Sequence, residues 1–194
     1  VSVPQIPLTG AFTIETWIYF EPGSVIDQKD GIVSSGTGKD GNDLNFYDGK
    51  LRLYHNAPGE PRADHVVANT AVTAGAWTHV AVTRDSAGNL FVYLNGVLDA
   101  ASAVPWTGTF NVDELGTAVK GNSSDAEFDN LRIWSVERSA AQIAADMGNT
   151  QPSDTTGLER NYSFEGTSIT DLTGSTAPVP VPPEVALVAS GAPV

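Results

Sequence analysis

Apolar and polar positions alternate along much of this chain with a period of two residues. The clearest case is residues 12–20, where the even positions carry Phe and Ile apart from one Thr. The odd positions of the same stretch carry Thr, Glu, Trp and Tyr. A period of two is typical of a strand whose two faces meet different surroundings. The pattern therefore predicts a strand over residues 12–20, and Pro22 and Gly23 end it.

Two short turns join further alternating segments into hairpins. Asp48 and Gly49 separate residues 44–47 from 51–54, and Asn95-Gly96 follows the β-rich residues 91–94. Both residues of a type I′ turn take positive φ, which Asn, Asp and Gly tolerate better than other residues. These segments predict antiparallel ribbons, and an antiparallel meander largely decides the fold class.

The remaining pattern completes an all-β chain with one helix. Ser139 and Gln142 form a capping box at the start of a short helix, for which Gly148 suits the C-terminal cap. Short strands at regular spacing predict a two-sheet antiparallel jelly-roll sandwich, with the domain over residues 1–176. Residues 177–194 form a Pro-rich extended segment, either a last strand or a linker to a next module. Further strands are expected at 1–4, 31–35, 66–67, 79–83, 114–116, 128–134, 158–165 and 184–190.

Composition excludes several classes of partner. The chain has 194 residues, no cysteine and a formal net charge of −13. Nucleic acids and anionic membranes are recognised through Lys and Arg, so neither is expected as a partner. No apolar run is long enough to insert into a membrane. The negative charge has two readings, solubility or binding of divalent cations by clustered carboxylates.

Several segments together indicate a family. GAFTIETWIYF, TAGAWTHVAVTRD, VYLNGV and FDNLRIWSVERSAAQI resemble the matching segments of laminin-G-like, concanavalin A-like jelly-roll modules. That fold is related to the pentraxins and hosts lectins, glucanases and inert spacers, so it does not fix a function. The resemblance to modules of bacterial surface proteins and polysaccharide-active enzymes implies an extracellular or cell-surface location in a bacterium. It also implies neighbouring modules in a larger protein.

Acidic loops suggest a calcium site. Calcium takes six to eight oxygen ligands from carboxylates, amides and backbone carbonyls, and two loops are rich in such groups. The resemblance to pentraxins implies that these loops hold the cation together, although the second lacks the acidic series of that family. The alternative is that both are solvated turns. The candidate ligands are Asp40, Asn42 and Asp43 in the first loop and Asn122 and Asp125 in the second.

A further metal candidate is Asp129. The strand FDNLRIW resembles a glucanase strand whose Asp binds a structural calcium together with backbone carbonyls. Asp129 should point away from the face that carries Phe128. The alternatives are an ion pair with Arg132 and the capping of a turn.

Aromatic residues outside the strand pattern are candidates for sugar binding. Sugars stack their C–H faces on aromatic rings while polar side chains bind the hydroxyls. Trp106 lies in a loop with Pro105 and Gly108, away from periodic apolar positions. The alternative for Trp106 is packing over a sheet edge. The other candidates are Tyr47 and Tyr54, which flank the Asp-Gly hairpin, and Arg62 and His65 in the following loop.

Catalysis is not expected. Glu127 and Asp129 match the start of a retaining-glucanase motif, which needs a second glutamate further along the same strand face. Positions 131 and 132 are Leu and Arg, so the pair is incomplete. Glu15 could complete it only by meeting Glu127 across the sheets. No catalytic or metalloprotease spacing joins the three histidines.

The sequence therefore predicts a non-catalytic extracellular carbohydrate-binding or adhesion module with calcium-ordered loops and a glycan or polysaccharide as partner. Two alternatives remain. One is a structural spacer or assembly module in a repetitive surface protein, and the other is a glycoside hydrolase or lyase of the same fold.

Overall fold

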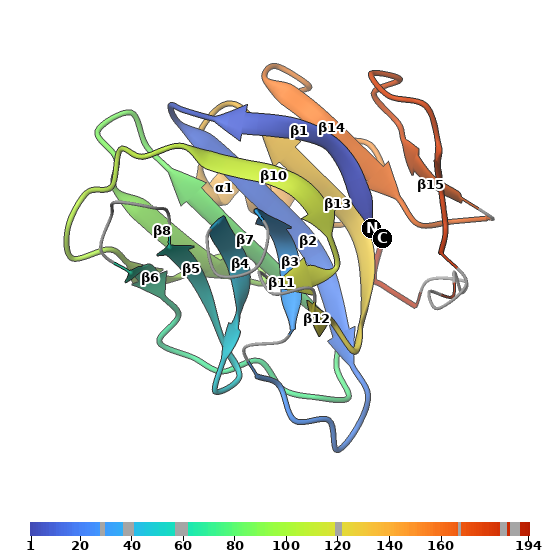
Figure 1. Cartoon of the computed structure of the whole chain (residues 1–194), viewed down its shortest axis with the longest axis horizontal. Coiled ribbons are helices and arrows are strands. Elements are labelled where there is room, and N and C mark those ends of the chain that lie inside the picture. Colours follow the sequence, from blue (N-terminus) through green and yellow to red (C-terminus); the bar gives the residue numbers. More distant parts are fainter. Residues whose placement is uncertain are drawn as a thin grey trace.

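Strands form nearly all of the regular structure in the computed structural model of this chain (Figure 1). The structure describes residues 1–27, 30–36, 41–56, 62–118, 122–166, 168–182, 186 and 191–194, with the backbone alone at 122 and 123. The elements in chain order are β1 (Ser2–Leu8), β2 (Phe12–Phe20), β3 (Gly31–Ser35), β4 (Gly41–Tyr47), β5 (Lys50–Asn56), β6 (Ala63–Val67), β7 (Thr78–Arg84), β8 (Leu90–Leu94), β9 (Val97–Ala101), β10 (Phe110–Leu115), β11 (Thr117–Ala118), β12 (Asn122–Ser123), β13 (Ala126–Trp134), α1 (Ala140–Asp146), β14 (Leu158–Ser163), β15 (Ser168–Asp171) and β16 (Val179–Pro180).

Two antiparallel sheets make up the sandwich. The six-stranded sheet has the order β1-β10-β3-β4-β5-β6, and the eight-stranded sheet has the order β16-β15-β14-β13-β2-β7-β8-β9. A small β11-β12 ribbon accompanies them. The all-β jelly-roll prediction is confirmed. β16 falls within the Pro-rich segment and pairs with β15, so this part of the segment extends the larger sheet.

The core lies between the sheets and comes from the alternation seen in the sequence. The even positions of β2 face the core, and Phe20 meets Phe46 of the opposite sheet edge-to-face, with ring centroids 5.3 Å apart. Of the odd positions of β2, which face outward, Thr13, Glu15 and Trp17 are buried as well, whereas Tyr19 is half-buried. They are buried because α1 covers the outer face of the eight-stranded sheet, where Ile143 packs against Ala81 and Tyr93.

The local signals act as predicted at most places. Asp48 and Asn95 have φ of 52° and 50°, as type I′ turns require. Ser139 accepts a hydrogen bond from the Gln142 backbone N–H, which confirms the capping box. Gly148 directly follows Met147, the C-cap of α1, so it stands where a capping glycine is expected, but it does not adopt the left-handed φ of such a cap.

Candidate functional site

The outer face of the β4-β5 hairpin carries a row of three flat side chains. The guanidinium carbon of Arg52 lies 4.9 Å from the ring centroid of Tyr47 and 4.9 Å from that of Tyr54. Strand alternation explains this placement, because Leu51 and Leu53 turn into the core and leave Arg52 between them facing outward. We call Tyr47, Arg52 and Tyr54 the tyrosine row.

Polar partners hold the centre of the tyrosine row in place. Arg52 donates from Nε to Asn45 Oδ1 at 2.9 Å and from Nη1 to Asp64 Oδ1 at 2.9 Å. The guanidinium is therefore fixed in direction and its charge is matched by the Asp64 carboxylate. Tyr47 remains 54% exposed, so its ring is available to a ligand. The arrangement is a preformed aromatic surface with polar groups beside it.

The other sugar-binding candidates gather on the opposite side of the same strands. The Trp106 ring stacks on His65 at 4.5 Å with an interplanar angle of 17°, and His55 lies 5.3 Å from it. Trp106 is only 7% exposed and belongs to the core. A Cβ at Gly108 would come within 2.6 Å of the indole, so a residue without a side chain is needed there. Trp106 thus packs over the end of the sandwich rather than forming an open platform.

Arg62 is exposed beside this cluster, where its Nε donates to Asn56 Oδ1 at 3.1 Å. Trp106, His65 and Arg62 therefore lie at one end of the six-stranded sheet. Tyr47 and Tyr54 lie on its outer face, so the five sugar-binding candidates fall into two groups.

The predicted calcium ligands do not form one set among the described residues. Asn42 and Asp43 are neighbours in β4, so their side chains point to opposite faces. The Asn42 amide is already bonded to Asn111, donating to its carbonyl at 2.6 Å and accepting from its N–H at 3.1 Å. Asp40 lies outside the described residues.

The second predicted loop is tied to a residue that sequence reasoning missed. Asn122 pairs with Ala118 in the small ribbon, and the backbone N–H of Asp125 donates to Asp30 Oδ1 at 3.2 Å. Asp30 is buried, and its other carboxylate oxygen accepts from the Asp27 N–H at 2.9 Å. A lone aspartate between turns gave no sequence signal for this role.

Asp129 belongs to the other sheet. It is buried on the outer face of β13 opposite Trp17, and its Oδ1 accepts from the Asn130 N–H at 2.8 Å. In the part of the chain that the structure describes, no three His, Cys, Asp or Glu side chains are grouped closely enough to hold a metal ion. Calcium therefore remains a prediction, and Asp129 does not share a site with Asp43.

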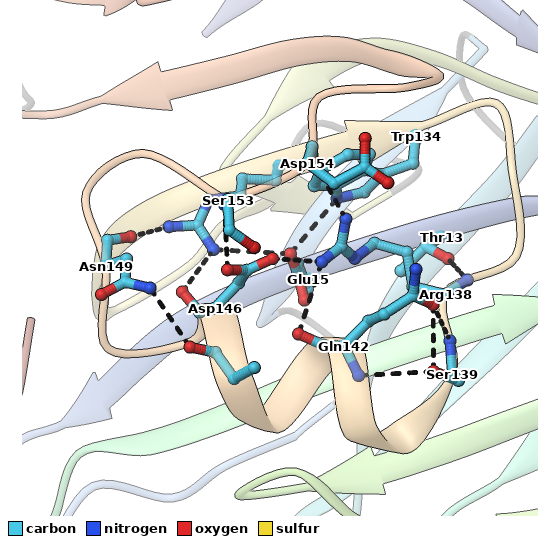
Figure 2. A network of polar contacts seen from close by, with 12 residues as sticks. Thr13, Glu15, Trp134, Arg138, Ser139, Gln142, Asp146, Asn149, Ser153 and Asp154 are labelled. Atoms are coloured by element: carbon cyan, nitrogen blue, oxygen red, sulfur yellow. Dashed lines mark hydrogen bonds and ion pairs between the residues drawn. The ribbon is translucent and has the colours of Figure 1, made fainter.

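A buried polar network lies under α1 (Figure 2). Glu15 accepts hydrogen bonds at Oε1 from Trp134 Nε1 at 3.2 Å and from Arg132 Nη1 at 3.5 Å. Arg138 forms an ion pair with Asp146 and lies over the Trp134 ring, 4.0 Å from its centroid. Ser153 donates its backbone N–H to Asp146 at 3.0 Å. Two carboxylates face two guanidinium groups, so the network is balanced in formal charge.

Burial sets the protonation of this network. Loss of solvation raises the pKa of Glu15, and the charges of Arg132 and Arg138 counteract only part of that rise. His79 lies 3.9 Å from Glu15 Oε2, and burial together with the charge of Arg132 lowers the pKa of His79 to about 3. His79 is therefore neutral at neutral pH. The network is suited to holding the helix on the sheet, because its charged groups bind one another.

The carboxylates of β13 do not form a hydrolytic pair. Glu127, Asp129 and Arg132 face the same side of the strand, since they pair with Tyr19, Trp17 and Glu15 across a bulge at Asn130. Arg132 thus occupies the position that a second glutamate would need. Glu127 and Glu15 belong to one sheet. Glu127 of β13 pairs with Tyr19, which is four residues after Glu15 in β2, so the two acids are roughly 13 Å apart. The two carboxyl groups of a retaining glycosidase are about 5 Å apart. The prediction that these two acids could meet across the sheets is wrong.

A family model describes three quarters of the sequence. The model of the concanavalin A-like lectin/glucanases superfamily, of the third laminin G type, matches residues 1–144. No curated protein matches the chain. Among the described residues, none of the helical structure reaches the length and hydropathy of a membrane span.

Solved structures of low sequence identity share the fold. A candidate carbohydrate binding protein from Bacteroides ovatus has a TM-score of 0.61 at 20% identity, over 88% of this chain and 55% of that one. Domain 4 of AbnA, an extracellular GH43 arabinanase from Geobacillus stearothermophilus in complex with arabinotriose, has a TM-score of 0.55 at 21% identity. That alignment covers 70% of this chain and 66% of the domain.

A third structure comes from a toxin. Botulinum neurotoxin type C, whose cell entry depends on two ganglioside molecules, has a TM-score of 0.51 at 18% identity. The alignment covers 79% of this chain and 38% of the toxin chain. This chain therefore spans between about two fifths and two thirds of the length of these three structures.

Proposed function

Since this chain belongs to the concanavalin A-like lectin/glucanase superfamily, we propose that it is a non-catalytic module that binds a glycan on the tyrosine row. The observation that carries the proposal is the Tyr47-Arg52-Tyr54 arrangement on the outer face of the six-stranded sheet, where the Tyr47 ring is exposed. The proposal is consistent with the structures that share the fold, which include a candidate carbohydrate binding protein, an arabinanase domain in complex with arabinotriose and a neurotoxin whose cell entry depends on gangliosides. The host is then a larger extracellular protein with neighbouring modules, which is part of the proposal.

The chemistry of the tyrosine row suits a sugar. A pyranose offers an apolar C–H face, which packs on an aromatic ring, and a rim of hydroxyls, which needs fixed donors and acceptors. Tyr47 supplies an exposed ring, while Arg52 and Asp64 supply a donor and an acceptor that already hold each other in position. Preorganisation of this kind lowers the entropy lost when the ligand binds.

A glycan array on the isolated chain, followed by calorimetry with the best oligosaccharide, tests the proposal. We expect Tyr47→Ala to weaken binding about tenfold, or about 1.4 kcal/mol, because the stacking surface is lost. Tyr47→Phe keeps the ring and should bind within about threefold of the parent chain, which is about 0.6 kcal/mol. Leu98→Ala on β9 is the control, because Leu98 is also 54% exposed but lies in the other sheet.

The two alternative functions give different results. A spacer module shows no saturable binding to any glycan on the array. A hydrolase or lyase releases products from the bound oligosaccharide and loses this activity in Glu127→Gln. Arg132 in place of a second carboxylate favours binding without hydrolysis.

The proposal also includes a calcium ion that orders the loop containing Asp40. Thermal melting with calcium and then with chelator tests it, since a site at a hundredfold excess over its dissociation constant adds about 2.7 kcal/mol. Asp43→Ala and Asp129→Ala in the same assay distinguish a site in the six-stranded sheet from one in the eight-stranded sheet. An unchanged melting temperature removes calcium from the account and leaves the tyrosine row unaffected.

A further inference from the structure

A concave site, separate from the tyrosine row, lies at the edge of the sandwich and is lined by residues of β1, β10, β13 and β15. It is a cleft of about 720 Å³. Its floor is apolar and includes Ile32, Leu115 and Leu131 of the core. Phe128 and Phe164 form a wall, with ring centroids 6.5 Å apart. We call it the edge cleft.

The edge cleft exists because two neighbouring strands differ in length. β14 pairs with β13 from Leu131 to Trp134, so the first half of β13 extends beyond the end of β14. Asn130, at φ 48°, marks the bulge where the two halves meet. The first half of β13 is therefore bordered on this side by the cleft, and both of its faces contribute lining residues.

The charge of the edge cleft is negative. Five carboxylate residues line it, and no Lys, Arg or His side chain is among the described residues that do. The amino group of Val1 lies 3.5 Å from the Glu114 carboxylate and forms an ion pair with it, so the charge of Glu114 is matched. Within the described part of the chain, neither Asp125 nor Glu127 forms an ion pair with a basic side chain. The five carboxylates belong to Glu114, Asp125, Glu127, Asp129 and Glu165.

Glu127 also stands beside an aromatic pair. It is directly opposite Tyr19 on the outer face of the sheet, and the Tyr19 and Trp77 ring centroids are 5.6 Å apart. Trp77 and Glu127 both line the edge cleft. A carboxylate next to an indole and a phenol ring attracts an ammonium group both by charge and through the ring faces. A neutral ligand would use only the rings, and an anionic ligand would be repelled.

We propose that the edge cleft binds a protonated amino sugar within an oligosaccharide of the glucosamine type. This rests on the proposed function, because it assumes that the module recognises glycans, but it assigns a separate site and a narrower ligand class. One sugar ring stacks on the aromatic wall, and the ammonium group of a neighbouring sugar in the oligosaccharide lies near Glu127 and Trp77. The cleft volume is sufficient for a short oligosaccharide.

The test is calorimetry at about pH 6, with glucosamine oligomers and their fully N-acetylated counterparts of equal length as probes. Acetylation removes the positive charge and keeps the sugar ring. We expect the glucosamine oligomer to bind at least about tenfold more tightly, and we expect added salt to reduce the difference. Glu127→Gln should remove most of the preference, while the exposed Glu137→Gln outside the cleft should keep it.

Two results would overturn the assignment. One is equal affinity for the charged and acetylated oligomers, and the other is a preference that survives in Glu127→Gln with an unchanged melting temperature. Trp77→Phe is the second variant, since it preserves the packing while it weakens the attraction for a cation. It should therefore reduce the preference for the glucosamine oligomer. Binding of neutral glycans that is lost in Tyr47→Ala and kept in Glu127→Gln would support the tyrosine row alone, so the two proposals can fail separately.

Discussion

At the scale of single residues, the least expected feature is the number of charged groups buried beneath α1. Glu15, Arg132, Arg138 and Asp146 are each at most 2% exposed. Removal of a charge from water costs several kcal/mol, which a partner must offset. Here each carboxylate has a guanidinium partner, and Arg138 also contacts the Trp134 ring. The network therefore stabilises the fold only while it is complete.

Loss of one member of the Arg138-Asp146 pair should be costly. We expect Asp146→Ala to lower the free energy of unfolding by about 3–5 kcal/mol, because the Arg138 charge stays buried without its partner. Urea denaturation measures the change. The double variant Arg138→Met, Asp146→Leu should recover much of the loss, since it removes both charges and fills the space. A double variant that is less stable than Asp146→Ala would contradict this account.

His79 predicts a pH dependence of stability. Its folded pKa of about 3 lies below the ordinary value of 6.5, so its contribution is present above pH 6.5 and is lost as the pH falls towards 3. Between pH 7 and pH 5 the loss is about 2 kcal/mol. Glu15 acts in the opposite direction, because its raised pKa favours the fold in acid.

Comparison with His79→Gln isolates the histidine, because Glu15 and Arg132 are present in both chains. Urea denaturation at pH 7 and pH 5 should show a steeper loss in the parent chain than in the variant. Equal losses in the two chains would mean that His79 does not set the pH dependence.

At the scale of elements, the short helix depends on its cap and on its contact with the sheet. α1 has seven residues, fewer than an isolated helix needs in water. We expect Ser139→Ala to cost about 1 kcal/mol in the free energy of unfolding, because the hydroxyl that accepts from the Gln142 backbone N–H is lost. The exposed Ser86→Ala in the β7-β8 turn is the control and should be nearly neutral. An effect of equal size at Ser86 would speak against a capping role.

The Asn95-Gly96 turn of the β8-β9 hairpin packs against α1. Gly96 has φ of 77°, and a Cβ there would lie 2.9 Å from the Cβ of Ala144. We expect Gly96→Ala to cost about 1–3 kcal/mol through backbone strain and this contact. The double variant Gly96→Ala, Ala144→Gly should recover the part due to the contact. Urea denaturation of both variants separates the effect of backbone strain from that of the contact with Ala144. If the double variant is no more stable than Gly96→Ala, the whole loss of stability comes from backbone strain.

Most elements could be predicted from the sequence because their causes are local. The alternation predicted β2 with the correct first and last residues, and the turns at Asp48-Gly49 and Asn95-Gly96 predicted the hairpins. β15 and the small ribbon were missed, because short strands without alternation carry little local signal. The candidate site was predicted in part. Tyr47 and Tyr54 flank a hairpin that the sequence reveals, but Arg52 between them depends on strand register, and the edge cleft depends on where β14 ends.

At the scale of the whole molecule, the two sheets have different outer surfaces. α1 (Figure 1) and the polar network beneath it cover part of the eight-stranded sheet. On the six-stranded sheet, Tyr47 is exposed on the outer face of the β4-β5 hairpin. A net charge of −13 disfavours anionic polysaccharides as partners. Our two proposals accordingly assign neutral sugars to the tyrosine row and amine-bearing sugars to the edge cleft.

The central claim is that glycans bind on the outer face of the β4-β5 hairpin. The most direct measurement is a titration of the isotope-labelled chain with the best array oligosaccharide, followed by amide chemical shifts in NMR. The account predicts saturable shifts that centre on Tyr47, Arg52 and Tyr54 and that disappear in Tyr47→Ala. Saturable shifts confined to the face beneath α1, or no shifts with any array ligand, would contradict it.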